Sequence, residues 1–187
     1  MHPQLDTYRT QFHEIKTEAA TLVDGVDDAR LRTPPDAETW SAAQIFDHMN
    51  TAGWLLLSSM ESAIQDGHAQ GRRGTPPFEY GFVSRWFIRS MKPDSGWTFT
   101  APSVFEPEVT DTLYPSEGLS EFQELQDQCA QCVVDADGLD LRGIRVGSPA
   151  VPLLRISLGA WFEATLAHER RHLRQIQTVL GAVSDLY

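Results

Sequence analysis

Two histidines four residues apart are the residues in this sequence best placed to do chemistry. His168 and His172 stand in the string His-Glu-Arg-Arg-His, and in a helix this spacing puts both imidazoles on one face. Two imidazoles on one face can bind a single metal ion. The string also matches the H-E-x-x-H motif of zinc proteases, in which the glutamate is the general base. The position of a third ligand decides between a zinc protease and another kind of metal protein.

The residues after the motif do not support a zinc protease. Only 15 residues follow His172, and they include no further histidine or glutamate. The longer metzincin motif requires a glycine and a histidine where this sequence has Gln175 and Thr178. A zinc protease of this type also has a sheet before the motif helix, whereas the preceding sequence predicts mainly helices. The third ligand is therefore expected upstream of the motif.

Length, charge and cysteine content narrow the class of protein. At 187 residues, the chain is expected to form a single domain over residues 1–187. The formal net charge of −11 disfavours nucleic acid and anionic membrane surfaces as partners. The sequence shows no apolar run of membrane-spanning length, no signal peptide and no disulfide framework. We therefore expect a cytoplasmic protein without a nucleic-acid or membrane partner.

Two long helices are predicted in the first part of the sequence. Residues 5–26 carry apolar side chains at spacings of three and four, as in a bundle helix, and Gly25 is expected to end this helix. The second helix begins at Ser41, which stands at capping-box spacing from Gln44, and runs to about residue 65. Its inward stripe is predicted to be Ile45, His48, Ala52, Leu55, Ser59 and Ala63. His48 would therefore face the core.

Two more long helices are predicted in the second half. The third spans about residues 117–137 and carries Cys129 and Cys132 on its apolar stripe. Redox-active C-x-x-C motifs usually begin a helix, so this mid-helix pair is interpreted as two buried structural thiols. The fourth helix is expected to begin near Pro152 and to continue to about residue 180, with both motif histidines facing inward.

A long segment, residues 68–116, connects the second and third helices. It is predicted to contain a short helix near residues 80–91, where Tyr80 or Trp86 could contact a substrate. The whole pattern predicts an all-α protein: a four-helix bundle with one long crossover connection between helices two and three. Metal sites in such bundles are built from inward-facing residues of neighbouring helices.

These elements bring three histidines together as candidate metal ligands: His48, His168 and His172. Three imidazoles leave an open coordination position that can activate water or polarise a substrate. Glu169 is interpreted as a solvated residue paired with a neighbouring arginine, or alternatively as a residue that contacts a ligand of the metal. Gln175 lies one turn beyond His172, where it either orients a metal-binding histidine through a hydrogen bond or simply lies at the edge of the bundle.

The order Trp40-Ser41, then His48, then the string of residues 168–175 resembles the DinB-like (DinB/YfiT) superfamily. The resemblance spans essentially the whole chain. It implies a four-helix bundle whose histidine triad binds a divalent metal, with zinc or nickel as the expected ion, and it implies a homodimer. It also implies action on a small-molecule substrate as a metal-dependent hydrolase or as a transferase that uses a low-molecular-weight thiol. The alternative is a non-catalytic metal-binding or stress-response scaffold.

Overall fold

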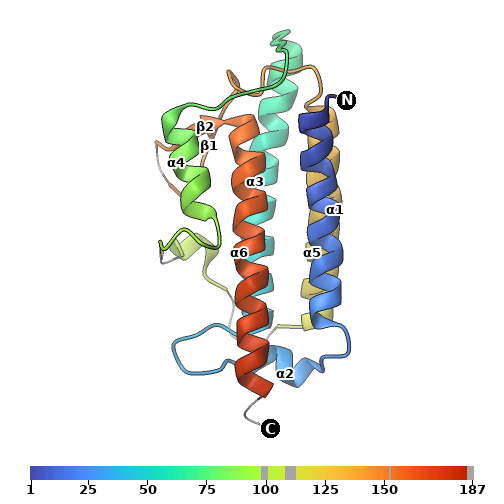
Figure 1. Ribbon diagram of the computed structural model, residues 1–187, viewed down its shortest axis with the longest axis vertical. Coiled ribbons are helices and arrows are strands. Elements are labelled where there is room, and N and C mark those ends of the chain that lie inside the picture. Colours follow the sequence, from blue (N-terminus) through green and yellow to red (C-terminus); the bar gives the residue numbers. More distant parts are fainter. Residues whose placement is uncertain (98–100, 108–112, 152, 185–187) are drawn as a thin grey trace.

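Four long helices dominate the computed structural model, which describes residues 1–97, 101–107, 113–151 and 153–184. They lie side by side along the long axis of the molecule (Figure 1). Their bounds are α1 (Pro3–Val23), α3 (Ala42–Ala69), α5 (Pro115–Asp135) and α6 (Leu158–Ser184). Two shorter helices, α2 (Asp28–Arg32) and α4 (Phe82–Met91), and the 3-10 helix η1 (Ser103–Phe105) lie in the connections. The all-α prediction is confirmed.

The long helices pack as a square in which α1 and α3 each contact both α5 and α6. Helices α1 and α6 run in one direction and α3 and α5 in the other (Figure 1). Because α3 and α5 are parallel neighbours, the chain must travel back along the bundle between them. It does so through α4 and η1, on the outside of the bundle. This segment is the predicted crossover connection.

Apolar periodicity explains most of the core. Four phenylalanines, one from each long helix, are among the largest fully buried side chains: Phe12, Phe46, Phe122 and Phe162. The predicted capping box at the start of α3 is present. The backbone N–H of Gln44 donates to Ser41 Oγ at 3.2 Å, and the backbone N–H of Ser41 donates to the side-chain Oε1 of Gln44 at 3.0 Å. These two bonds satisfy backbone donors that have no partner within the helix.

The predicted inward stripe of α3 was partly wrong. Leu55 is 41% exposed, whereas the neighbouring Leu56 and Leu57 are buried. Beyond Ile45, the buried apolar residues of the helix are Phe46, Met49, Leu56, Leu57, Met60 and Ile64. The prediction followed His48 along the helix and so tracked a line one position away from this stripe. Gly53 interrupts the apolar pattern at the point where Leu125 of α5 packs directly against the α3 backbone.

The predicted start of the fourth helix was also wrong. Pro152 lies outside the described residues, and α6 begins at Leu158. A small antiparallel hairpin precedes it, formed by β1 (Arg145–Gly147) and β2 (Arg155–Ser157). Trp161 fixes the helix to this hairpin, because its indole Nε1 donates to the Val146 carbonyl at 3.1 Å. Strands of three residues are too short to give a clear alternating pattern in the sequence.

A buried tyrosine pair anchors the crossover at the end of the bundle where α1 begins. The Tyr8 hydroxyl donates to Glu163 Oε1 at 2.6 Å and lies 3.1 Å from the Tyr80 hydroxyl. Burial is the main cause that raises the pKa of Tyr80 to about 12. Tyr80 is only 5% exposed, so it belongs to the core, which corrects the expectation that it contacts a substrate.

Gly159 should be essential for this anchor. A methyl group at Gly159 would overlap the Tyr80 ring and hydroxyl. We expect Gly159→Ala to lower the free energy of unfolding by about 1–3 kcal/mol, the usual cost of overpacking a core. Urea unfolding would measure this change. Gly181→Ala on the same helix is the matched control, because nothing lies within 4 Å of the added methyl group; it should cost nothing and stabilise by up to about 1 kcal/mol. Equal effects of the two substitutions would contradict this account of the anchor.

Candidate metal centre

Three histidines converge between α3 and α6. His48 comes from α3, and His168 and His172 lie one turn apart on α6. One ring nitrogen from each residue can be chosen so that all three lie within 4.8 Å of one another. The ring centroid of His48 lies 5.4 Å from that of His168 and 4.8 Å from that of His172. The structure therefore brings together the three histidines that the sequence singled out.

Hydrogen bonds at Nδ1 orient two of the three imidazoles. His48 Nδ1 lies 2.7 Å from the Phe105 carbonyl oxygen, and His172 Nδ1 lies 3.0 Å from Gln175 Oε1. Both partners accept hydrogen bonds, so each Nδ1 carries the proton and each Nε2 keeps its lone pair. This arrangement is typical of metal-bound histidines, whose second nitrogen donates to a carbonyl or carboxylate.

The Nε2 atoms of His168 and His172 face each other at 3.1 Å. A tetrahedral zinc ion with Zn–N bonds of 2.0–2.1 Å separates its ligand nitrogens by about 3.4 Å. The observed spacing is close to that value, so a metal ion could take the place of a proton shared between these two nitrogens. The donor set therefore fits a divalent metal ion.

Burial keeps these imidazoles in the neutral form that binds metals. It is the main cause that lowers the pKa of all three histidines, and it brings the pKa of His172 to about 3. The positive charge of Arg171 lowers the pKa of His168 and His172 further. Protons therefore compete weakly with a metal for these nitrogens.

Helix α6 also holds the crossover beside the histidines. Arg171 donates to the backbone carbonyls of Ser90 and Trp97, and Arg174 forms an exposed ion pair with Asp94 at 2.7 Å. Further along the crossover, the Phe105 carbonyl holds His48 as described above. The segment from the end of α4 to η1 is thus attached to both helices that supply histidines.

Glu169 is buried, whereas it was predicted to be a solvated side chain. It is 2% exposed and accepts a hydrogen bond from Gln126 Nε2 at 2.9 Å, so it is not a solvated partner of a neighbouring arginine. Among the described residues, no hydrogen bond joins it to the three histidines, and its Oε2 and Gln126 Oε1 have no partner. A protonated carboxyl can donate from Oε2 to that amide oxygen and satisfy both atoms. Accordingly, burial raises the pKa of Glu169 to about 8.

Sequence reasoning missed this buried pair because its two members lie 43 positions apart on different helices. Gln126 stands among the apolar residues of α5, and an uncharged polar residue at a core position was the available signal. Gln175, in contrast, was named from its spacing alone, and the structure places it against His172.

The two cysteines are buried, as their place on the α5 stripe predicted. Cys129 is 1% and Cys132 is 2% exposed, and both thiols are free. Burial raises the pKa of both, that of Cys132 to about 12. Since the thiolate is the reactive form, these residues are not suited to redox chemistry in the folded protein.

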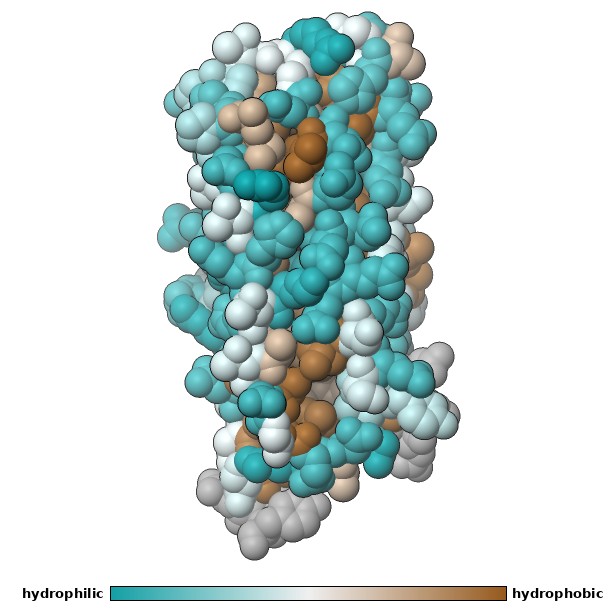
Figure 2. Space-filling view, turned by 90° about the vertical axis from the view of Figure 1, so that its right-hand side faces the viewer, coloured by the Kyte–Doolittle hydropathy of each residue, from teal (hydrophilic) through white to brown (hydrophobic). Residues whose placement is uncertain are grey.

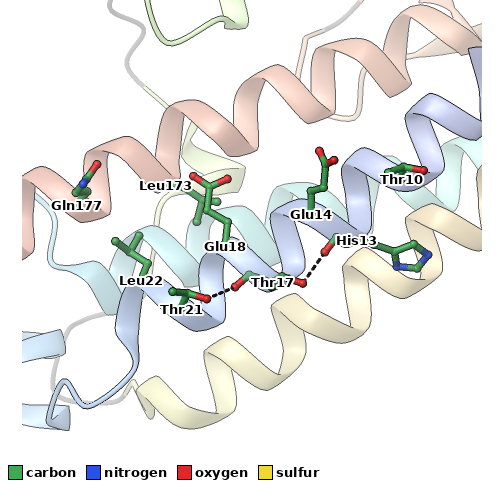
Figure 3. Close-up of a pocket in the computed structure, with 9 residues that line it drawn as sticks. All are labelled: Thr10, His13, Glu14, Thr17, Glu18, Thr21, Leu22, Leu173 and Gln177. Atoms are coloured by element: carbon green, nitrogen blue, oxygen red, sulfur yellow. Dashed lines mark hydrogen bonds between the residues drawn. The ribbon is translucent and has the colours of Figure 1, made fainter.

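A groove of about 660 Å³ between α1 and α6 offers no comparable chemistry (Figure 3). Among its lining residues, Thr17 and Thr21 donate to carbonyls of their own helix, those of His13 and Thr17. Its remaining polar residues stand along α1, apart from Gln177 on α6, and do not converge on a point (Figure 3). The histidine cluster is therefore the stronger candidate for a functional site.

The buried carboxyl of Glu169 should make stability depend on pH. Its pKa rises from an ordinary 4.5 to about 8 on folding, so its contribution is fully present below pH 4.5 and is lost as the pH rises toward 8. Relative to Glu169→Gln, which keeps an uncharged side chain, the unmodified protein should lose about 1.4 kcal/mol per pH unit within this window. Urea unfolding in the presence of a chelator, at several pH values, would measure the difference. A pH-independent difference would show that Glu169 is ionised in the folded protein.

Comparison with known proteins agrees with this architecture. The family model of the DinB superfamily matches residues 11–176. The uncharacterized protein YuaE of Bacillus subtilis (strain 168) is 20% identical over 168 residues, which cover 90% of this chain and 94% of that protein. No solved structure matches the chain. The family match covers both helices that carry the histidines and most of the bundle, so the chain belongs to the DinB superfamily.

Proposed function

We propose that this protein binds one divalent metal ion through His48, His168 and His172 and uses it to act on a small molecule. The convergence of the three histidines, with two of their Nε2 lone pairs fixed by hydrogen bonds at Nδ1, carries the proposal. Zinc or nickel is the expected ion; imidazole ligands also suit copper and iron, so the ligands alone do not name the metal. Gln175 acts as a positioning residue that fixes the tautomer of His172.

The chemistry follows from the charge of this donor set. Bound by three imidazoles, a divalent ion keeps a coordination position open and supplies Lewis acidity there. The cluster found among the described residues contains no carboxylate, so its ligands do not neutralise the ion. Arg171 adds a further positive charge close to His168 and His172. Such a site favours an anionic nucleophile or substrate, such as hydroxide or a thiolate.

Two reaction classes use such a site: hydrolysis of a small electrophile, and transfer of a low-molecular-weight thiol to it. In both, the histidines hold the ion, and Arg171 attracts the anion. The expected homodimer and the expected thiol cofactor belong to this proposal. The second candidate function is a non-catalytic metal-binding scaffold. The burial of His48, which is only 4% exposed, favours this candidate because it restricts access to the site.

Metal content tests the ligand assignment. Purified protein should bind about one equivalent of zinc or nickel, and His168→Ala should abolish stoichiometric binding in elemental analysis. Gln175→Leu should weaken binding by about 10- to 100-fold, the usual effect of losing an outer-shell partner, in competition with a chromophoric chelator. His13→Ala is the control, because His13 is an exposed histidine on α1. Equal metal content in the His168→Ala and His13→Ala proteins would refute the assignment.

Activity tests the proposed chemistry. Metal-loaded protein should hydrolyse a nitrophenyl ester or couple a thiol such as cysteine methyl ester to chlorodinitrobenzene. His172→Ala should reduce either rate by at least about 100-fold, because the ion is lost with its ligand. The same assay after chelation and after metal restoration separates loss of the ion from loss of folding. A rate that is unchanged in His172→Ala would exclude metal-dependent catalysis, and inactivity of fully loaded protein in a broad panel would favour the scaffold.

A further inference from the structure

One side of the molecule combines exposed apolar side chains with cations that form no ion pair among the described residues, and we call it the α4 face. It is formed by the outward surface of α4, the turn after it, and the adjacent hairpin, which contacts α4 through β2. Its apolar members are Phe82, Val83, Trp86, Trp97, Val151 and Leu153. Its cationic members are Arg85, Arg89, Lys92, Arg145 and Arg155. We infer that this face binds an anionic lipid surface.

The apolar side chains of the α4 face project outward. Leu153 is 100% exposed at the tip of the hairpin, and Phe82 is 77% exposed at the start of α4. The half-exposed rings of Trp86 and Trp97 pack edge to face with centroids 6.0 Å apart. The helix itself is held firmly, because Phe87 packs on Trp161 of α6 with centroids 5.2 Å apart. A rigid element that presents aromatic and aliphatic side chains beside arginine and lysine is typical of interfacial membrane binding.

Charge is distributed very unevenly over the chain. Residues 82–97 and 145–155 contain five of the 15 cationic residues and one of the 26 acidic residues, a net charge of +4. The remaining residues therefore carry −15. Among the described residues, none of the five cations of the α4 face lies within 4.0 Å of a carboxylate. The partner of this face is therefore anionic.

The net charge of −11 argues against an anionic surface only if the acidic residues lie near it. Helix α5 has five acidic residues and no cation, and it lies on the opposite side of the bundle from α4 (Figure 1). Figure 2 shows that side, which is largely hydrophilic. Two layers of helices, spaced about 10 Å apart, separate the two sides. Since the Debye length is about 8 Å at physiological salt, the five acids of α5 repel the surface weakly.

A second copy of this chain is a poor occupant of the α4 face. Pairing of two α4 faces about a two-fold axis would place Arg85, Arg89 and Lys92 against the same cations. Pairing of the α4 face with the acidic α5 of another copy would be complementary in charge, but opposite sides of one molecule form open chains rather than closed dimers. The expected homodimer would have to use another surface.

The shape of the α4 face distinguishes between two possible anionic partners, a lipid surface and an acidic protein segment. A helical peptide needs a groove to receive its apolar side chains, whereas the side chains at Phe82 and Leu153 protrude from the molecule. Protruding side chains can enter the headgroup region of a bilayer, where tryptophan and arginine are also favourable. The observations therefore favour a lipid surface.

Cosedimentation with vesicles tests this inference. The unmodified protein should sediment with vesicles that contain one-third phosphatidylglycerol, and it should bind vesicles of phosphatidylcholine alone at least about tenfold more weakly. Binding should fall as salt is raised. Both Phe82→Ser/Trp86→Ser and Arg85→Gln/Arg89→Gln should lower the partition coefficient on the anionic vesicles by about tenfold or more.

Two matched variants on the opposite side are the controls. Val134→Ser removes an exposed apolar side chain of α5, and Arg9→Gln/Lys16→Gln removes two cations of α1 that form exposed ion pairs. Both should bind within about twofold of the unmodified protein, and unfolding midpoints of all variants would show that they are folded. Absence of binding to the anionic vesicles, or equal binding by all variants, would overturn the inference. Binding to an acidic amphipathic peptide but not to vesicles would also overturn it and identify a protein partner.

Discussion

The structure depends on one electrostatic constraint: three imidazoles must face one another inside the bundle without carrying a positive charge. Two Nε2 atoms at 3.1 Å can share one proton, but burial removes the water that would otherwise solvate a charged pair. A second proton would give the pair a positive charge, which burial and Arg171 oppose. A divalent cation resolves the constraint without disturbing the surrounding packing.

This constraint explains why the crossover is attached where it is. Free imidazoles exchange tautomers readily, so a site that needs Nε2 lone pairs must fix a proton on Nδ1. The bundle helix that carries His172 provides the acceptor Gln175 from its own next turn. For His48, the acceptor is instead the backbone carbonyl of Phe105, 57 positions later. The crossover is therefore part of the histidine cluster as well as a connection.

Local spacing determined how much could be predicted from the sequence. The i, i+4 pair on α6, the capping box at Ser41 and the stripe of α5 are all patterns within one helix, and all were predicted correctly. The hairpin before α6 was missed because its strands are three residues long. The burial of Glu169 was missed because Gln126, its partner, comes from another helix. The inward stripe of α3 was misjudged because a glycine, not a large apolar residue, marks its closest approach to α5.

The parallel arrangement of α3 and α5 has a consequence for the order in which the protein folds. His48 and His168 are 120 positions apart, and each belongs to a helix that becomes fixed only when the crossover has passed along the bundle. Contacts between such distant segments form late, because a long loop must close before they contribute any stabilisation. Helices α1 and α3, joined by the short α2, pack on α5 and α6 rather than on each other, so the first half of the chain gains most of its packing only when the later helices arrive. The histidine cluster is thus a product of the last stages of folding, and a metal captured there would slow the unfolding of the finished bundle more than it speeds its assembly.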